Sequence, residues 1–380
     1  MTKKIEFTVN TNELLNFAKT VKSDDLTVLF ERQDDKTVRI RVNENNVSSI
    51  LLANTYEILD ENSFSTVLKN FFSIVLKEEH ASSIIKFMKV LNKNKSVKFT
   101  FDDEKLNINE NGVNMDFKID ENNGCIAQNG ELLYSFKADT KRVIRALKNC
   151  KPFQMKGEEG RRAALNNILL QVNDKGFKLV ALDGFKLLAE NIEAEITKNG
   201  EFNEDHYKHR ILLENEMIDR LKKLKSEKMN FRIYENVIEV FDGDSLILVQ
   251  QMVNEEFFQY ETLLKTEDGK QVLASQVEEV EQYLKTVIKM EDKNPLVKFS
   301  SSKKGFVGES GKMKVKKEFE NKEFRKDYII GFNGKYLLDA ISTFDGEGFE
   351  IYNEDRVKQV IMFNEERTAL VLPVRLDKYE

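Results

Sequence analysis

Residues 161–189 read RRAALNNILLQVNDKGFKLVALDGFKLLA, and this stretch decides the fold class. Apolar runs lie on both sides of the group NDKG at 173–176, which is typical of two strands joined by a short turn. Asp183 and Gly184 predict a second turn, because Asp-Gly favours the backbone angles of tight turns. Strands joined by turns this short are antiparallel, so the stretch predicts an antiparallel sheet.

The rest of the chain repeats one layout three times. Two stretches resemble linkers, ENNGCIAQNGE at 121–131 and KTEDGK at 265–270, because both are rich in turn-forming residues and lack a regular apolar pattern. They divide the 380 residues into three segments of similar length. The sequence therefore predicts three repeated domains, at 1–125, 126–264 and 265–380.

Each segment opens with a short strand, which is followed by a helix with one apolar face. A second helix comes later in each segment, and alternating runs such as SVKFTF at 96–101 and ALVLPVRL at 369–376 predict strands. The layout predicts an α+β fold, with two helices packed on antiparallel sheets in each domain. From the 3.6-residue apolar spacing, the helices are expected at 12–22, 80–92, 140–151, 214–227, 277–290 and 334–343.

Charge and composition exclude several classes of protein. The net charge is −6, and no stretch approaches the roughly 20 apolar residues that span a bilayer. Cys125 and Cys150 are too few for a disulfide framework, so they are expected to be thiols of a cytoplasmic protein. His206 and His209 have the spacing of metal ligands but no nearby cysteine, so no metal or other cofactor is expected.

The solvent sides of the predicted helices are rich in lysine and arginine. In a chain that is acidic overall, this pattern places positive charge on helices and negative charge on strands and loops. A surface built of helices would then attract a polyanion, although a solvated face remains the alternative for any single helix. The candidate DNA-binding residues are Lys19, Lys22, Lys86, Lys89, Lys141, Arg142, Arg145, Lys148, Arg220, Lys222, Lys223, Lys285 and Lys289.

Two patterns that suggest an enzyme are weak. GFVGESGK at 305–312 resembles a phosphate-binding loop, but Phe306 stands where that loop needs glycine and Met313 where it needs Ser or Thr. We expect a hairpin turn there instead. Asp183 next to Lys186 is explained more simply as a turn residue than as a catalytic carboxylate. The sequence therefore predicts no catalytic site.

Three segments resemble one family. They read ALDGFKL at 181–187, FNGKYLLDA at 332–340 and LPVRL at 372–376. In this order they resemble the patterns A-T-D-G-H-R-L, F-N-x-x-Y-L-x-D-A and M-P-M-R-L of the bacterial sliding clamp, the β subunit of DNA polymerase III. That family is also built from three domains with six helices. The resemblance is good over the last two thirds of the chain, and the first third matches only in layout.

The resemblance implies a head-to-tail homodimer that closes into a ring, with the helices around the hole and the sheets outside. The lysines would face double-stranded DNA and attract its phosphates without reading base sequence. The implied function is that of a non-catalytic processivity factor. Its partners would be duplex DNA, the DNA polymerase III α subunit, the clamp loader and other proteins that carry a clamp-binding peptide.

The resemblance further implies a pocket between the second and third domains that accepts a short apolar peptide. Leu182 replaces the usual Thr, Phe185 the usual His and Phe258 the usual Pro, so we expect a more apolar pocket. Plain core packing is the alternative for Leu182 and Phe185. Carried over residue by residue, the pocket comprises Leu165, Leu182, Gly184, Phe185, Lys186, Leu187, Phe258, Tyr260, Leu263, Leu370, Val371, Leu372, Pro373, Val374, Arg375 and Leu376.

For the ring interface, the resemblance places Val287 and Ile288 of the third segment against Met115 and Phe117 of the first. Ordinary core packing is the alternative for these four residues. The first segment has SDDLTVLFERQDD at 23–35 where the family has an apolar stretch with proline. This divergence favours a second hypothesis, in which the chain is a clamp-derived binding scaffold that does not close on DNA.

Overall fold

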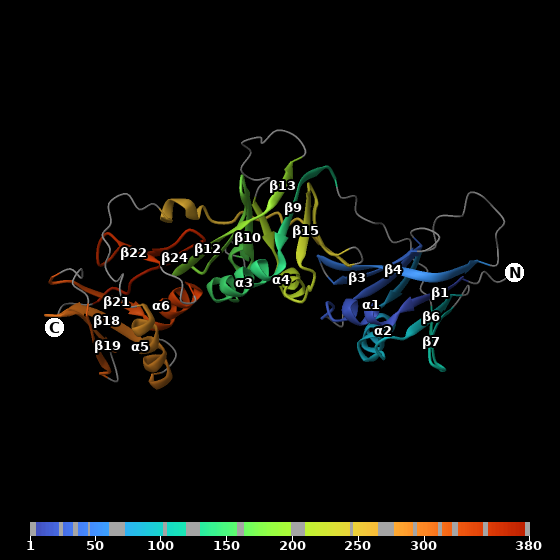
Figure 1. The fold of residues 1–380 in the computed structure, drawn as a ribbon, viewed down its shortest axis with the longest axis horizontal. Helices are drawn as coiled ribbons and strands as arrows, with labels where there is room; N and C mark the ends of the chain where they lie inside the picture. Colours follow the sequence, from blue (N-terminus) through green and yellow to red (C-terminus); the bar gives the residue numbers. More distant parts are fainter. Residues whose placement is uncertain are drawn as a thin grey trace. The chain divides into compact units, whose positions relative to one another are not determined.

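The computed structural model describes residues 5–22, 26–32, 37–44, 46–60, 73–101, 105–118, 130–157, 163–198, 210–243, 246–264, 277–291, 295–310, 314–320, 326–344 and 349–376. The chain forms two compact units. Figure 1 labels the helices and strands from which they are built. One consists of residues 1–141, 194–204 and 215–253, and the other of residues 142–193, 205–214 and 254–380. Both combine helices with antiparallel sheets, so the predicted α+β class is confirmed. The three-domain division stays a prediction, and Cys125, most of 121–131 and all of 265–270 lie outside the described residues.

In the first unit, helix α1 (Thr11–Ala18) packs against α2 (Glu78–Val90) and strand β4, and α4 (Asn215–Leu221) packs on β17. Burial alternates along β3 and β6, so one face of the sheet carries the core. The 13 strands of this sheet are β1 (Ile5–Asn10), β2 (Thr27–Arg32), β3 (Thr37–Glu44), β4 (Val47–Asp60), β5 (Ser73–Lys77), β6 (Ser96–Phe101), β7 (Lys105–Glu110), β8 (Val113–Lys118), β9 (Leu132–Asp139), β13 (Glu195–Lys198), β15 (Lys228–Tyr234), β16 (Val237–Asp242) and β17 (Leu246–Gln251).

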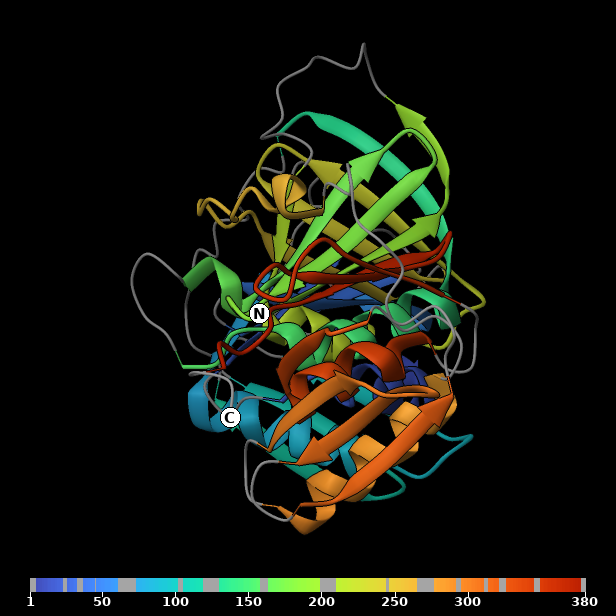
Figure 2. The same cartoon turned by 90° about the vertical axis from the view of Figure 1, so that its left-hand side faces the viewer.

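The second unit holds helices α3 (Thr140–Cys150), α5 (Val277–Met290) and α6 (Gly334–Ile341), with α5 packed against α6. In Figure 2 the orange strands of its four-stranded sheet face the viewer, with α5 beside them. That sheet has the order β20 (Lys316–Glu320), β19 (Gly305–Ser310), β18 (Leu296–Ser301), β21 (Ile329–Asn333). The seven-stranded sheet has the order β14 (Arg210–Leu213), β10 (Ile168–Asn173), β11 (Gly176–Leu182), β12 (Lys186–Glu193), β24 (Arg367–Val371), β23 (Val360–Phe363), β22 (Glu350–Asn353).

Antiparallel strand pairs connect the predicted segments at two places. β4 of the first segment pairs with β17 of the second, with Ser49 opposite Leu248. β12 of the second segment pairs with β24 of the third, with Leu188 opposite Ala369. We call the β4–β17 pair the first seam and the β12–β24 pair the second seam. The first seam lies within the first unit and the second seam within the second unit.

The six helices are found where the sequence predicts them, but two end early: the helix predicted at 12–22 ends at Ala18, and the second case is α4. Helix α5 has the predicted bounds, and Asn10 and Asn333 cap α1 and α6 by accepting hydrogen bonds from backbone N–H groups two residues later. The helix predicted at 214–227 ends at Leu221. It stops there because the next backbone bonds tighten to three-residue spacing and Asp242 accepts the N–H groups of Lys225 and Ser226.

The strand predictions hold for the hairpin at 173–176 and the turn at 183–184, which join β10, β11 and β12. Two other expectations are wrong. The strand predicted at 369–376 ends at Val371, before Pro373, although Val374 forms an isolated bridge with Gly331. The hairpin turn expected at 305–312 is strand β19 over Gly305–Ser310, paired with β18 and β20, while Lys312 lies outside the described residues.

Candidate functional sites

A tight turn between β11 and β12 sends Phe185 and Lys186 to opposite sides. The Asp183 carboxylate accepts the backbone N–H groups of Phe185 and Lys186, both at 2.9 Å, and Gly184 has a φ of +90°. Phe185 is 56% exposed, whereas Lys186 is 3% exposed. Burial raises the pKa of Asp183, although the two backbone hydrogen bonds and the Lys186 charge oppose that rise.

Two carboxylates and two aromatic rings surround the buried Lys186 ammonium. Lys186 forms an ion pair with Asp339 of α6, and its Nζ lies 4.0 Å from Asp183 Oδ2. The Nζ also lies 5.0 Å from the ring centre of Phe153 and 5.1 Å from that of Tyr336. These contacts replace the hydration that the ammonium loses on burial. Lys186 is therefore tied to helix α6 rather than offered to solvent.

The last described residues of the chain lie beside this turn. The Leu372 N–H donates to the Phe185 carbonyl at 2.8 Å, and the Val374 N–H donates to the Gly331 carbonyl at 2.8 Å. A Cβ on Gly331 would lie 2.7 Å from Leu376 Cδ2, so a larger residue there would require the Leu376 side chain to shift. Leu372 is 40% and Val374 38% exposed. We call Phe185, Leu372 and Val374 the apolar patch.

Part of the predicted pocket wall is buried. Leu182, Leu187, Leu370 and Val371 are buried in strands β11, β12 and β24, and Lys186 is buried as well. Their place in a pocket wall stays a prediction. Hydrophobic packing of the seven-stranded sheet holds the four apolar side chains inside. The predicted residues that do reach the surface beside the turn are Gly184, Phe185, Leu372, Pro373, Val374, Arg375 and Leu376.

The other predicted pocket residues lie on different parts of the second unit. Arg210 Nη2 donates to the Phe258 carbonyl at 3.0 Å, and Gln359 Nε2 donates to the Leu263 carbonyl at 3.3 Å. Tyr260 is buried, which raises the pKa of its hydroxyl, and its Oη lies 2.5 Å from Gln171 Oε1. Leu165 is half-buried, and its carbonyl accepts the N–H of Met155 at 3.0 Å.

Exposed lysines lie on α2, α3 and α5 and in the turn that follows α1. Lys22 forms an ion pair with Asp219, and Lys285 forms one with Glu281 at 2.8 Å. Ion pairs this exposed contribute little to stability, so these lysines remain accessible to a mobile polyanion. Of the candidate DNA-binding residues, the exposed ones are Lys19, Lys22, Lys86, Lys89, Lys141, Lys148, Lys285 and Lys289, and the half-buried ones are Arg142, Arg145, Lys222 and Lys223.

Lysines of α2 and of the turn after α4 meet the carboxyl end of α1. The Lys223 ammonium donates to the carbonyls of Lys19 and Thr20, and Lys89 donates to the Val21 carbonyl at 3.1 Å. The negative end of a helix dipole favours such cations. Burial, together with the charges of Lys22, Lys89 and Arg220, nevertheless lowers the pKa of Lys223 to about 8.

Two arginines of the candidate DNA-binding set form ion pairs with buried carboxylates at the seams. Arg220 was expected on the solvent side of its helix but is 1% exposed, so this expectation is wrong. It forms an ion pair with buried Glu44 and donates to Ser49 Oγ at 2.7 Å, and burial lowers the pKa of Arg220 to about 10. Arg142 forms ion pairs with buried Glu190 and, at 3.1 Å, with Glu366.

Of the four predicted ring-interface residues, two are buried and two are half-buried. Val287 is fully buried, and Phe117 is buried with its ring 6.1 Å from that of His80, as in ordinary core packing. Met115 and Ile288 are half-buried. The interface role of the four residues stays a prediction. Strands β8 and β20 each stand at an end of the strand order of their sheets.

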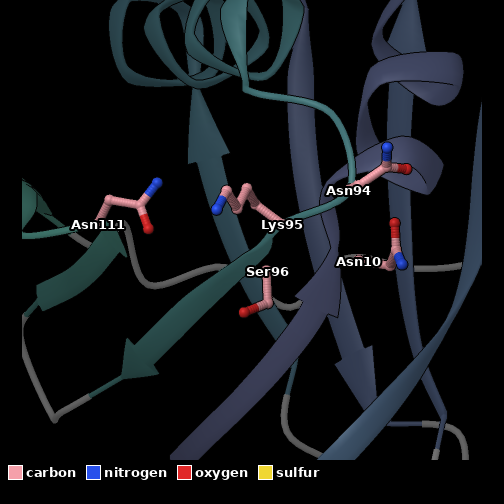
Figure 3. A pocket seen from close by; sticks show the side chains of 5 residues that line it. All are labelled: Asn10, Asn94, Lys95, Ser96 and Asn111. Carbon is pink, nitrogen blue, oxygen red and sulfur yellow. The ribbon is translucent and has the colours of Figure 1, made fainter.

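Figure 3 shows an open polar hollow in the first unit, where Lys95 and Asn111 extend toward each other from two loops. Asn10, Asn94 and Ser96 complete its lining. Asn10 caps α1, and Asn94 hydrogen-bonds Asn12, so these amides stabilise the loop around the helix start.

Within the described ranges, no three His, Cys, Asp or Glu side chains are grouped to hold a metal ion. His206 and His209 lie outside those ranges. The helices described by the structure include none that is both long and apolar enough to cross a membrane.

The sequence analysis did not identify the residues that contact Lys186 or those that form the ion pair of the second seam. Tyr336 and Asp339 stand three positions apart in the FNGKYLLDA motif, so they share one helix face, and this spacing could have identified them as partners of Lys186. Glu190 and Arg367 gave no comparable signal. They lie far apart in the chain and meet only through the pairing of β12 with β24.

No protein-family model matches the sequence, and no curated protein matches it. Solved structures do match. The DNA polymerase III β subunit of Thermotoga maritima is 20% identical with a TM-score of 0.72, over 98% of this chain and 100% of that chain. The Caulobacter crescentus polymerase III β and the Pseudomonas aeruginosa sliding clamp bound to griselimycin are each 16% identical with a TM-score of 0.77, over 98% of this chain and 100% of theirs. The chain therefore has the sliding-clamp fold.

Proposed function

We propose that this chain is a sliding clamp, a non-catalytic, ring-shaped processivity factor that encircles duplex DNA and tethers the replicative DNA polymerase. The observation that carries the proposal is the set of exposed lysines on α2, α3 and α5 and in the turn after α1, in a chain of clamp fold with net charge −6. Solvated lysines attract phosphates without reading bases, which suits a protein that slides. Enclosure, rather than tight binding, then keeps the ring on DNA.

The DNA function is tested by retention on nicked circular DNA after loading. Lys141→Glu together with Lys148→Glu should shorten retention and make it more sensitive to salt, because two helix charges change sign. The matched control is Lys303→Glu with Lys304→Glu, which reverses two exposed lysines of the β18–β19 turn. Equal retention of both double variants would refute a helix-lined DNA surface.

We also propose that the apolar patch is the docking site for clamp-binding peptides of the DNA polymerase III α subunit, the clamp loader and other partners. Exposed apolar side chains gathered on one edge commonly mark interaction sites. Phe185→Ala should weaken binding of a fluorescein-labelled peptide from the polymerase α subunit by about tenfold or more, from the lost apolar contact. Val357→Ala, at another exposed apolar position of the second unit, is the control. A loss shared by both variants, or by neither, would contradict the assignment.

The ring itself requires a homodimer. Strands β8 and β20 end their sheets and offer backbone edges with which a second copy can pair. Light scattering over a dilution series should give about twice the chain mass of 44.2 kDa. A monomer at every concentration would favour a clamp-derived scaffold that uses only its docking site.

A further inference from the structure

We propose that Lys186 is a positioning residue, which holds helix α6 under the β11–β12 turn so that Phe185 presents an aromatic face to a partner peptide. This inference rests on the proposed docking function of the apolar patch. It assigns Lys186 a role beneath the patch, whereas the clamp resemblance places this residue in the pocket wall. Phe185 is the residue that contacts the partner, and Lys186 acts through Tyr336.

The first step is the inaccessibility of the Lys186 charge. The side chain is almost completely buried, with its ammonium between Asp339, Asp183 and the rings of Phe153 and Tyr336. A partner side chain would have to displace one of these groups to reach it. Removing a buried charge from its partner is costly, so the ammonium stays with α6 when the patch is occupied.

The second step links Lys186 to the orientation of Phe185. Tyr336 and Asp339 lie on one face of α6, so a single ammonium holds the helix at two points. The Phe185 ring stacks on the Tyr336 ring with centroids 5.7 Å apart and planes inclined by 25°. One face of Phe185 is therefore supported by Tyr336, while more than half of the side chain remains exposed.

The third step concerns the backbone. Asp183 accepts the N–H groups of Phe185 and Lys186, and the Phe185 carbonyl accepts the Leu372 N–H at 2.8 Å. The Lys186 charge favours the ionised form of Asp183, which is the form that accepts both bonds best. Without it, Asp183 and Asp339 would face each other as like charges. The turn and the Leu372 strand end should both loosen.

The test combines peptide binding with hydrogen exchange. The probe is a fluorescein-labelled peptide that carries the clamp-binding segment of the polymerase III α subunit. Lys186→Met should weaken its binding about tenfold and speed amide exchange at 183–187 and 370–376, but not in the hairpin at 168–182. Lys186→Arg should restore both, because it keeps the charge and the ring contacts. Lys335→Met, at an exposed lysine of the same helix, is the matched control.

Two results would overturn the inference. One is unchanged exchange in Lys186→Met. The other is equal loss of binding in Lys186→Met and Lys186→Arg, which would make Lys186 a direct peptide contact. If Lys186→Met does not fold, the double variant Lys186→Met with Asp339→Asn is used instead in both measurements. It removes the Asp339 carboxylate that the lysine change leaves without its partner. Failure of the wild-type chain to bind the peptide would refute the docking function instead, and the exchange data would still decide whether Lys186 holds the turn.

Discussion

The two seams join strands in the same way but stabilise the junction with different charges. In the first seam, Arg220 of α4 meets one carboxylate, Glu44, and the Ser49 hydroxyl, all of them buried. In the second seam, one buried carboxylate, Glu190, meets two guanidinium groups, of Arg142 at a half-buried position and of Arg367 at 3.6 Å. The first seam pairs one carboxylate with one guanidinium group, and Glu44 also accepts the Lys22 N–H at 2.9 Å. The second seam shares one carboxylate between two guanidinium groups and reaches the surface through Glu366.

The difference shows what each seam needs to stay paired. Backbone hydrogen bonds are alike in every antiparallel pair, so they cannot by themselves fix which strands meet or in which register. A buried ion pair penalises every misaligned arrangement, because a charge without its partner is expensive inside a protein. In the first seam one guanidinium group, of Arg220, pairs with one carboxylate, of Glu44. In the second seam the single carboxylate of Glu190 pairs with the guanidinium groups of Arg142 and Arg367.

The largest predicted effect is the loss of Glu190. Glu190→Gln leaves two guanidinium groups with reduced compensation and also removes the carboxylate bond to Asn149 at 3.2 Å. We expect the free energy of unfolding of the second unit to fall by about 3–5 kcal/mol. Urea unfolding followed by hydrogen exchange in each unit gives the measurement. Glu44→Gln is the comparison and should act on the first unit, by less, because it strands one cation. The reverse ranking would contradict this account of the seams.

A smaller effect is expected when both charges of the first seam are removed. Glu44→Leu with Arg220→Met replaces the buried ion pair by apolar groups, which is often neutral or stabilising by about 1–4 kcal/mol relative to the original pair. The double variant should therefore recover the stability that either single variant loses. The same exchange in the second seam, Glu190→Leu with Arg367→Met, leaves Arg142 beside an apolar surface and should recover less. If the two double variants recover the same free energy of unfolding in the urea measurement, the two seams do not differ in the way proposed.

Acid should weaken the first seam through Asp219. Burial raises the pKa of Asp219, but the hydrogen bonds and charges of Lys22 and Lys222 outweigh it and hold the pKa well below its usual value. A depressed carboxyl pKa contributes stability above the unfolded value of about 3.9, and this contribution is lost as the pH falls further. Unfolding of the first unit measured from pH 6 down to pH 2 should show this slope, and Asp219→Asn should reduce it. An unchanged slope in Asp219→Asn would assign the acid sensitivity to other groups.

The sequence predicted the hairpins and helices near the seams better than the contacts that form the seams themselves. The hairpins around 161–189 and helix α5 follow from local turn chemistry and apolar spacing, so they were found. The bounds of α4 were missed because Asp242, distant in sequence, takes the N–H groups that would extend it. Arg220 was assigned to the solvent side because the chain position of Glu44 does not reveal that the two meet. The sequence motifs predicted the exposed residues of the docking site. They did not reveal that Lys186, which lies in the same motif as Phe185, is buried.

The smallest predicted effect is an alkaline response of the first unit, at Lys223 in the turn after α4. Lys223 has a pKa of about 8, lowered by burial and by Lys22, Lys89 and Arg220, compared with about 10.4 for a lysine in the unfolded chain. Between these two values the unfolded chain binds the extra proton, so this group makes stability rise with pH. The titration of the Lys223 Cε resonance gives the direct measurement. Lys22→Met removes one neighbouring cation and should raise the midpoint, whereas Lys303→Met, on a surface turn of the second unit, should leave it unchanged. A Lys223 midpoint near 10 in the wild-type chain would show that the Lys19 and Thr20 carbonyls compensate the ammonium better than its surroundings indicate. The first unit would then lack this pH response.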